Sequence, residues 1–312
     1  MNKLRHPLVS VVCPTYNHEK YIVQALDSFL MQKTDFSFEI VVGEDYSTDS
    51  TRTICQKYAK KYPDLINLIT SENNVGMHKN GLRVYNACKG KYIALCDGDD
   101  FWTDPLKLQK QVDFLEANPE YGYTFGKTKL YNDKKKEFIG VRGDKGSENY
   151  LNVLLGNVNI PTATVVFRRD LYKQCIHELD YLWKENLFYD YPLVLWFAKS
   201  SKIHFIDEEF SVYRILEESA CHTNSKEKSL NGGITFLKVQ MYFILNYPSF
   251  FKGEEILIYN QILSEVSRFL KINYYVGYDK QSKSRNYIIG KFIVSPFKLL
   301  KRLFIHKSMI KK

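Results

Sequence analysis

The chain has 312 residues, of which 45% are hydrophobic and 25% are charged, and this is the composition of an ordinary globular protein. The formal net charge of +9 comes from the C-terminal end, because residues 280–312 contain ten Lys and Arg and no Asp or Glu, which leaves 34 basic and 35 acidic side chains in the rest. A body without net charge argues against a nucleic-acid-binding surface, so we expect no nucleic acid among the partners.

The six cysteines form no C-x-x-C pair and have no metal-ligand spacing, which is typical of small core residues in a reducing compartment. The N-terminal stretch MNKLRHPLVSVV has no signal-peptide apolar region, and no segment approaches the roughly 20 apolar residues of a membrane span. These features predict a cytoplasmic protein.

Strand and helix patterns alternate in the N-terminal third. Apolar, β-branched runs predict strands at 8–13, 38–43, 66–70 and 92–96, and amphipathic spacing predicts helices at 17–31, 47–62 and 76–88. Asn17 is the expected cap of the first helix. Alternating strands and helices imply parallel β-α-β units, and hence an α/β fold with a Rossmann-like, mostly parallel sheet flanked by helices.

The pattern changes after Pro105. An amphipathic helix at 106–118 precedes predicted strands at 121–130 and 163–168, with a polar loop or hairpin between them, and then a helix at 193–199 and short strands at 203–206 and 210–213. Helices at 230–245 and 254–272 complete the pattern. We predict one α/β domain over 1–220, with halves 1–111 and 112–220, a helical extension over 221–279 and a basic tail over 280–312.

Polar clusters follow three of the predicted strands, at the point where each strand ends. Pro14-Thr15-Tyr16-Asn17 follows the first strand, Glu44-Asp45 the second and Asp97-Gly98-Asp99-Asp100 the fourth. Ligands bind at the carboxyl ends of the strands in open parallel sheets. The three clusters therefore predict a binding site at this edge, without reference to any relative.

The acidic loop at 97–100 has the composition of a site for a hard divalent cation. Mg²⁺ and Mn²⁺ prefer carboxylate oxygens and keep positions open for phosphate. Asp99 and Asp100 are the candidate ligands of Mn²⁺ or Mg²⁺, and Gly98 allows a tight turn between the acids. The alternative interpretation is a solvated acidic turn.

Glu44, Asp45 and Tyr16 are candidate contacts of a nucleotide base. A carboxylate after the second strand can accept a hydrogen bond from a base N–H, and a tyrosine ring can stack beside a base. The alternatives are a favourable charge near a helix N-terminus for Glu44 and a partly buried tyrosine for Tyr16.

Four motifs occur in order and at ordinary spacing, namely PTYN after the first strand, EDYSTD after the second, NNVG before the third helix and DGDD after the fourth strand. Together they resemble the N-terminal half of a family 2 glycosyltransferase with the GT-A fold, strongly over 7–111 and more weakly to Arg214. The resemblance implies an enzyme that moves a sugar from a nucleotide-sugar donor with the help of a divalent metal.

The resemblance also implies roles for single positions. Pro14, Tyr16 and Asp45 match residues that hold the base, and the acids of the DGDD loop match the signature that holds the metal, diphosphate and ribose. The full set expected at the nucleotide sugar is Pro14, Tyr16, Glu44, Asp45, Asn80, Asp97, Gly98 and Asp99, with Asp99 and Asp100 on the metal. Glu44 stands where the family usually has Asp, and Tyr46 stands where a small residue is common. These two departures affect the contacts with the base and therefore the identity of the nucleotide. UDP is the favoured nucleotide.

On the acceptor side, NLFYDYPLVLWFAKSSKIHFIDEEFSVYR resembles a later motif of the family, and Asp190 matches its acid. The match implies that Asp190 is the base that takes the proton of the acceptor hydroxyl. The alternative is a helix N-cap before Pro192. Tyr213, Arg214 and His222 are further candidates, for closing over the diphosphate.

The family mechanism implied is inversion in one displacement, with a glycan or lipid-linked glycan as acceptor, in the synthesis of a bacterial surface polysaccharide. One alternative is a sugar-phosphate nucleotidyltransferase, which would need a Gly-rich phosphate loop where PTYNHEKY stands. The other is a non-catalytic protein that binds nucleotide sugars on the same fold.

The basic tail predicts a peripheral membrane contact. Ser295-Pro296 is a typical helix start, and Phe297, Leu300 and Leu303 then fall broadly on one side among Lys and Arg. Such a segment can lie in an anionic interface, here the cytoplasmic face of the inner membrane. The alternative is a helix that packs on the body of the protein with its basic face in solvent.

Overall fold

The computed structural model describes residues 6–156, 159–184, 190–217, 226–254, 257–258, 260 and 262. The chain divides into two compact units, Met1–Thr223 and Asn224–Lys312. The predicted basic tail, most of the helix predicted at 254–272, and His222 lie outside the described residues.

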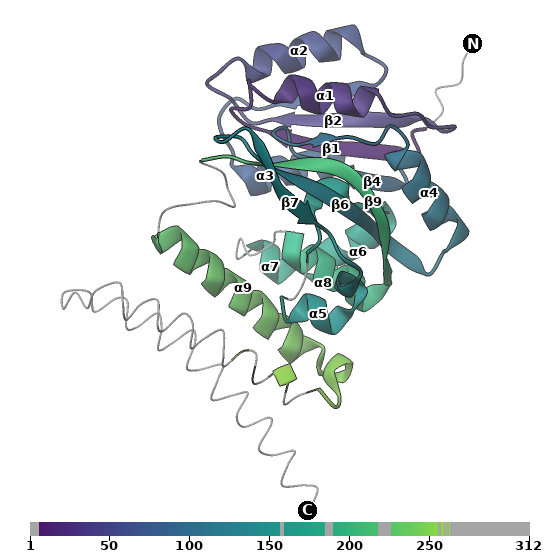
Figure 1. The fold of residues 1–312 in the computed structure, drawn as a ribbon, viewed down its shortest axis with the longest axis vertical. Coiled ribbons are helices and arrows are strands. Elements are labelled where there is room, and N and C mark those ends of the chain that lie inside the picture. Colours follow the sequence, from purple (N-terminus) through teal and green to yellow (C-terminus); the bar gives the residue numbers. More distant parts are fainter. Residues whose placement is uncertain are drawn as a thin grey trace, which may run out of the picture. The chain divides into compact units, whose positions relative to one another are not determined.

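The described strands of the first unit form one mixed sheet in the order β3-β2-β1-β4-β8-β6-β9-β5, with β7 paired to β6 (Figure 1). The strands are β1 (Val9–Thr15), β2 (Phe38–Glu44), β3 (Ile66–Thr70), β4 (Tyr92–Leu95), β5 (Phe101–Trp102), β6 (Tyr121–Asn132), β7 (Glu137–Arg142), β8 (Val166–Arg168) and β9 (Lys202–Ile215). Strands β3, β2, β1 and β4 are parallel neighbours, as predicted. β8 runs antiparallel to both β4 and β6, whereas β6 and β9 are parallel to each other.

Helices cover both faces of the parallel half (Figure 1). The helices of the first unit are α1 (Ile22–Leu30), α2 (Thr51–Lys61), α3 (Met77–Ala87), α4 (Lys107–Ala117), α5 (Tyr150–Leu154), α6 (Arg169–Glu178), α7 (Asp180–Lys184) and α8 (Asp190–Ser200), with 3₁₀ turns η1 (Lys145–Glu148) and η2 (Thr162–Thr164). Side chains alternate between the faces of a strand, so Val11 and Ile40 share a buried cluster with Leu26 of α1. On the other face α3 lies so close to β2 that a Cβ at Gly43 would be 2.2 Å from Val84 Cγ2.

The structure corrects three predicted elements. Helix α1 begins at Ile22, because Asn17 has a left-handed backbone with φ of 56° and its Oδ1 accepts a hydrogen bond from the Thr48 N–H at 2.8 Å instead of capping a helix. The strands predicted at 203–206 and 210–213 are one strand, β9, whose register against β6 shifts near the polar residues 207–208. Helix α6 was not predicted. The polar segment after β6 forms the β6–β7 hairpin.

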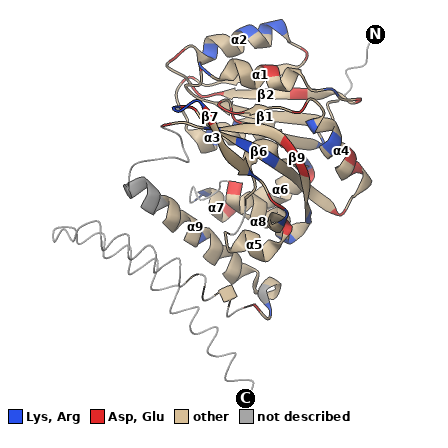
Figure 2. Ribbon diagram, in the orientation of Figure 1, with Lys and Arg blue, Asp and Glu red and all other residues tan. Residues whose placement is uncertain are grey.

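The second unit contains helix α9 (Lys226–Asn246) and the 3₁₀ turn η3 (Pro248–Phe251). Among the described residues of the whole chain, no helix has the length and apolarity needed to cross a membrane. In the first unit, Lys and Arg are interspersed with Asp and Glu along the described helices and strands (Figure 2), in line with the near-zero charge counted for the body.

Candidate active site

The loops after β1, β2 and β4 lie side by side at the carboxyl edge of the sheet. Parallel pairing places β1 between β2 and β4, and the backbone bonding continues beyond the strand ends. The Asp45 N–H donates to the Thr15 carbonyl and the Gly98 N–H donates to the Pro14 carbonyl, each at 3.1 Å. The predicted convergence of the three polar clusters is therefore confirmed.

The acidic loop is held against the loop after β1. A Cβ at Gly98 would lie 2.6 Å from Thr15 Oγ1 and 2.9 Å from His18 Nδ1, so only glycine fits this position without movement. The His18 ring contacts Thr15 Oγ1 at 3.2 Å, and its Nε2 is 3.8 Å from Asp99 Oδ2. His18 thus lies between the two loops, although the sequence did not single it out.

The carboxylates of the acidic loop differ in accessibility. Asp97 is exposed and Asp99 is partly exposed, whereas Asp100 is 3% exposed and its Oδ1 accepts a hydrogen bond from the Arg214 N–H at 2.8 Å. Asp99 and Asp97 therefore face ligands from solvent more readily than Asp100 does. Asp100 instead ties the loop to the end of β9.

The carboxyl groups of the acidic loop repel one another, and the charge of Arg214 offsets part of this repulsion at Asp100. Solvent reaches Asp97, but the surrounding protein desolvates its carboxyl group and so raises its pKa. The charges of Asp99 and Asp190 raise this pKa further. Desolvation and then the charge of Asp99 also raise the pKa of Asp100, against the lowering effect of the hydrogen bond from the Arg214 N–H. A bound cation would relieve this repulsion.

The carboxylates fit a divalent cation that shares its coordination with phosphate. Within the described ranges, no three His, Cys, Asp or Glu side chains form a group able to hold a metal by themselves. Mg²⁺ bound with nucleotides commonly takes only one or two carboxylates, and substrate phosphates and water supply the other ligands. Asp99, with Asp97 beside it, meets that requirement.

Arg214, near the end of β9, contacts the acidic loop. Its guanidinium donates to the Asp99 carbonyl and to Gln24 Oε1, and it lies 4.6 Å from the ring centroid of Phe101 and 5.0 Å from that of Tyr21. Arg214 is 5% exposed. Arg214 thus lies beside the acidic loop and contacts its backbone; its predicted role of closing over the diphosphate stays a prediction.

Glu44 and Asp45 organise the loops around them. Glu44 is fully buried, with Oε1 accepting from the Ser47 N–H at 2.6 Å and Oε2 from Arg52. The carboxylate of Asp45 accepts from the N–H groups of Val75 and Gly76, both at 2.9 Å, which places the NNVG segment against the end of β2.

Two exposed tyrosines project from these loops. Tyr16 and Tyr46 are 41% and 46% exposed. Two hydrogen bonds join the loops that carry them, one from the Asp45 N–H to the Thr15 carbonyl and one from the Asn17 N–H to Ser47 Oγ. Tyr46 has a φ of 62°, which is rare for an aromatic residue. The Arg52 guanidinium lies 5.2 Å from the centroid of the Tyr46 ring.

Asn80 connects helix α3 to the carboxyl end of β2. It is 2% exposed on α3, and its Nδ2 donates to the Gly43 carbonyl at 2.8 Å. Asn80 therefore fixes α3 against the end of β2, and its side chain does not face solvent. Pro14, half-buried, contributes the carbonyl that accepts from Gly98.

Asp190 is the first residue of α8 and lies near the acidic loop. Its Oδ2 accepts a hydrogen bond from Thr162 Oγ1 at 2.6 Å. The carboxyl is open to solvent yet surrounded by enough protein that desolvation raises its pKa, while the Thr162 hydroxyl lowers it by stabilising the ionised form. The charge of Asp190 contributes, after desolvation and Asp99, to the raised pKa of Asp97.

A family model described as "Glycosyl transferase family 2" matches residues 10–176. The chain belongs to glycosyltransferase family 2. A relative from Bacillus subtilis, the "putative teichuronic acid biosynthesis glycosyltransferase TuaG", is 37% identical over 119 residues, which are 38% of this chain and 46% of that protein. The chain spans about half the length of most of the curated relatives it matches.

Two solved glycosyltransferases share the GT-A fold of this family 2 member. The mannosyltransferase PcManGT from Pyrobaculum calidifontis, in complex with GDP-Man and Mn²⁺, has a TM-score of 0.55 at 16% identity over 97% of this chain and 84% of its own. Staphylococcus aureus TarS 1-349, in complex with UDP-GlcNAc, has a TM-score of 0.54 at 19% identity over 85% and 81%. At these identities the likeness establishes the fold.

The close approach of Gly98 to Thr15 predicts that Gly98→Ala destabilises the protein. The added methyl forces the acidic loop away from Thr15 and His18, and we expect the free energy of unfolding to fall by about 1–3 kcal/mol in urea denaturation. Gly81→Ala is the matched control, because a Cβ at Gly81 of α3 meets no atom within 4 Å; this change is expected to add about 0.5–1 kcal/mol. Equal stability of Gly98→Ala and the unmodified protein would contradict the described loop contact.

Proposed function

We propose that this chain transfers a sugar from a nucleoside-diphosphate sugar, with UDP-sugars favoured, to a glycan or lipid-linked glycan, in the synthesis of a surface polysaccharide. The observation that carries the proposal is the meeting of the loops after β1, β2 and β4 at one edge, where the exposed rings of Tyr16 and Tyr46 and the carboxylates of Asp97 and Asp99 lie on neighbouring loops. Family membership supports the reaction class, and the name of TuaG supports the polysaccharide.

Nucleotide binding is assigned to the loops after β1 and β2. The exposed rings of Tyr16 and Tyr46 are placed to contact the base from neighbouring loops. Asp45 is 2% exposed and holds the NNVG segment through two backbone N–H groups. Its Oδ1 also accepts from Ser71 Oγ at 3.3 Å, so Oδ2 is the oxygen that keeps a lone pair for a base N–H. Glu44 and Asn80 act as positioning residues, because the Glu44 carboxylate is occupied by the Ser47 N–H and Arg52, and the Asn80 amide donates to the Gly43 carbonyl.

The diphosphate and its metal are assigned to the acidic loop. Asp99 would hold Mn²⁺ or Mg²⁺ together with the accessible Asp97, and Asp100 would keep the loop in place through the Arg214 N–H. When bound, the cation supplies positive charge that offsets the charge growing on the departing diphosphate. PcManGT, whose complex contains Mn²⁺, supports a divalent cation in this fold.

The role of the base that deprotonates the acceptor hydroxyl is assigned to Asp190. Its ionised carboxylate takes the proton of the hydroxyl as that oxygen attacks the anomeric carbon. The bond from the anomeric carbon to the diphosphate oxygen breaks in the same step, its electron pair leaves with the nucleoside diphosphate, and the anomeric configuration inverts. The Thr162 hydroxyl orients the carboxylate and favours its ionised form.

The direct test of the function is a panel of nucleotide sugars with Mn²⁺, followed by thermal denaturation and by release of nucleoside diphosphate. A nucleotide sugar that binds the native state raises the melting temperature of the protein. Release of the nucleoside diphosphate from that nucleotide sugar shows turnover. Stabilisation without release would favour the non-catalytic binding protein. Formation of a nucleotide sugar from a sugar phosphate and a nucleoside triphosphate would favour the nucleotidyltransferase.

Asp99→Asn is expected to weaken Mn²⁺-dependent binding of UDP about tenfold or more, because the accessible carboxylate of the acidic loop loses its charge. Calorimetry with and without Mn²⁺ measures the effect. Binding in the presence of EDTA serves as the control and should not fall. Unchanged Mn²⁺-dependent binding would remove Asp99 from the metal site.

Tyr46→Gly is expected to stabilise the backbone yet weaken nucleotide binding. Glycine relieves the left-handed conformation at φ of 62°, but the ring beside the proposed base position is lost. Lys136→Gly is the control for the backbone effect, since Lys136 has a φ of 55° in the β6–β7 turn and no assigned contact with the nucleotide. It gives up an exposed ion pair with Asp133 and should keep its UDP affinity. The melting temperature and the UDP affinity of both variants separate the effect on the backbone from the loss of the ring. Full UDP affinity of Tyr46→Gly would exclude a contact between the Tyr46 ring and the base.

Asp190→Asn is expected to lower kcat by about 10²–10⁴-fold, because the base is lost, while donor binding stays intact. Steady-state transfer and calorimetry with UDP measure the two effects. Asp180→Asn, at an exposed acid that begins α7, is the control and should keep its activity. Turnover of Asp190→Asn near that of the unmodified protein would assign the base elsewhere.

Thr162→Val is expected to shift the acidic limb of the kcat/KM pH profile to higher pH. Removing the hydroxyl removes a bond that favours the ionised carboxylate, so the pKa of Asp190, already raised by desolvation, rises further. Thr162→Ser keeps a hydroxyl and should restore the profile. A uniform loss of rate at every pH, without a shift of the limb, would contradict this role.

A further inference from the structure

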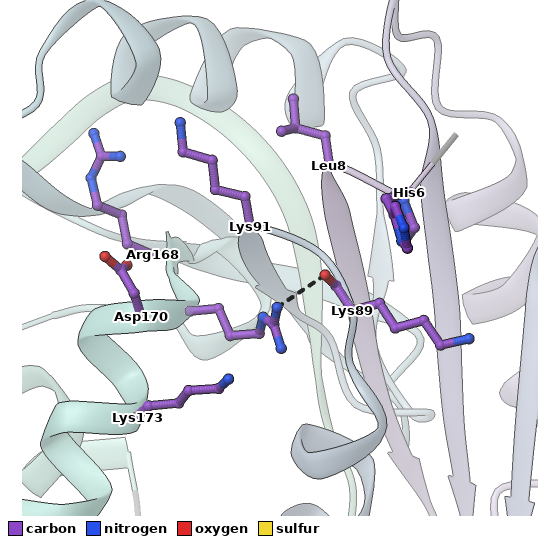
Figure 3. Close-up of a pocket in the computed structure, with 9 residues that line it drawn as sticks. His6, Leu8, Lys89, Lys91, Arg168, Asp170 and Lys173 are labelled. Atoms are coloured by element: carbon purple, nitrogen blue, oxygen red, sulfur yellow. Dashed lines mark hydrogen bonds between the residues drawn. The ribbon is translucent and has the colours of Figure 1, made fainter. Parts of the chain in front are cut away.

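A cationic pocket lies at the opposite edge of the sheet from the proposed nucleotide site. Its volume is about 530 Å³, and it opens where β1 and β4 begin and where β8 ends (Figure 3). Strand β1 has 7 residues, so at about 3.3 Å per residue the two edges are roughly 20 Å apart. The pocket is therefore separate from the nucleotide-binding loops.

Positive charge dominates the lining of the pocket. The lining cations are Lys89, Lys91, Arg168, Arg169 and Lys173, and the lining acid is Asp170. They come from separate parts of the chain, since Lys89 and Lys91 precede β4 whereas Lys173 is on α6 (Figure 3). Because the body of the protein has almost no net charge, this concentration of cations is local.

Carboxylates neutralise part of this charge, because Asp170 lines the pocket, Glu116 pairs with Lys91, and Glu39 Oε1 accepts from the Lys89 N–H at 2.7 Å. Arg168 donates to the carbonyls of Tyr121 and Leu115, and Arg169 donates to those of Cys88 and Lys89 at 2.9 and 3.1 Å. These bonds fix the guanidinium groups but leave their charge in place.

Among the described residues, Lys91 is the lining cation with a carboxylate partner, Glu116 at 2.8 Å. The exposed ammonium groups of Lys89 and Lys173 have no ion pair within the described part of the chain. Two guanidiniums in fixed positions and two free ammonium groups therefore surround the same cavity.

The start of α6 adds to the positive potential. Helix α6 has 10 residues and begins at Arg169, beside the pocket; no side chain accepts a hydrogen bond at its N-cap, and the Arg169 N–H donates to the Lys91 carbonyl at 2.9 Å. The first-turn N–H groups of a helix carry partial positive charge and bind anions. Asp170 in that turn offsets part of the charge and leaves the lining cations in excess.

We propose that this pocket binds a phosphate-bearing anion, either a free diphosphate or the phosphorylated head of a larger molecule. Several cations from different elements, two of them held by backbone carbonyls, are suited to the multiple oxygens of such a group. The cavity is larger than a single phosphate requires. Binding here is independent of sugar transfer at the other edge.

The test uses the full chain and the double variant Lys89→Gln, Lys173→Gln, which removes the two unpaired ammonium groups and leaves the bonded arginines. The matched control is Lys57→Gln, Lys60→Gln, which removes two exposed lysines from α2, away from the pocket. Calorimetry with inorganic pyrophosphate in EDTA is expected to show affinity about tenfold or more weaker for the pocket variant than for the control. Binding of UDP with Mn²⁺ should be equal in all three proteins.

Sedimentation with vesicles distinguishes the sources of the phosphate. Vesicles of phosphatidylcholine with phosphatidylglycerol are compared with phosphatidylcholine alone. Selective loss of vesicle binding by the pocket variant identifies a lipid headgroup, and selective loss of pyrophosphate binding alone identifies a soluble phosphate. If the pocket variant and the control bind both probes equally, or if the unmodified chain binds neither, the proposal is wrong.

Discussion

The pairing of β1 between β2 and β4 is the constraint on which the candidate site depends. All three strands are parallel, so their ends lie at one edge, and backbone bonds continue from the strands into the loops. Each loop is held by main-chain groups whose bonds are independent of side-chain identity. The side chains of Tyr16 and Asp99, which solvent reaches, are consequently held by loops with fixed backbones, and this would lower the entropic cost of binding the proposed ligand.

A second connection reaches the same loops from the other half of the sheet. Asp100 and Arg214 join the acidic loop to the end of β9, which pairs with β6 along most of its length. Helix α8 with Asp190 directly precedes β9 in the chain. The acidic loop is thus bonded to the end of β9, and the helix that begins with Asp190 leads into the start of the same strand.

The sequence predicted the parts of the fold that local periodicity controls. Strands β1 to β4 and the meeting of their loops followed from apolar runs and β-α-β order, and they are confirmed. Asn17 illustrates what sequence could not supply, because its side chain bonds to Thr48 in a loop distant in the chain. The roles of His18 and Thr162 likewise depend on tertiary contacts, since neither residue belongs to a local motif. Asp100 was predicted as a metal ligand from its place in DGDD, but its burial against Arg214 is visible only in three dimensions.

The account is tested most directly by hydrogen–deuterium exchange of the full chain with and without UDP and Mn²⁺. It predicts slower exchange of backbone amides in three separate segments, 15–18, 45–48 and 97–100, because the nucleotide and its metal would bind where these loops meet. Peptides at the opposite edge, around Lys89 and Arg169, should be unchanged. Protection confined to that opposite edge, or no protection of the three loops at saturating nucleotide, would contradict the assignment of the nucleotide site.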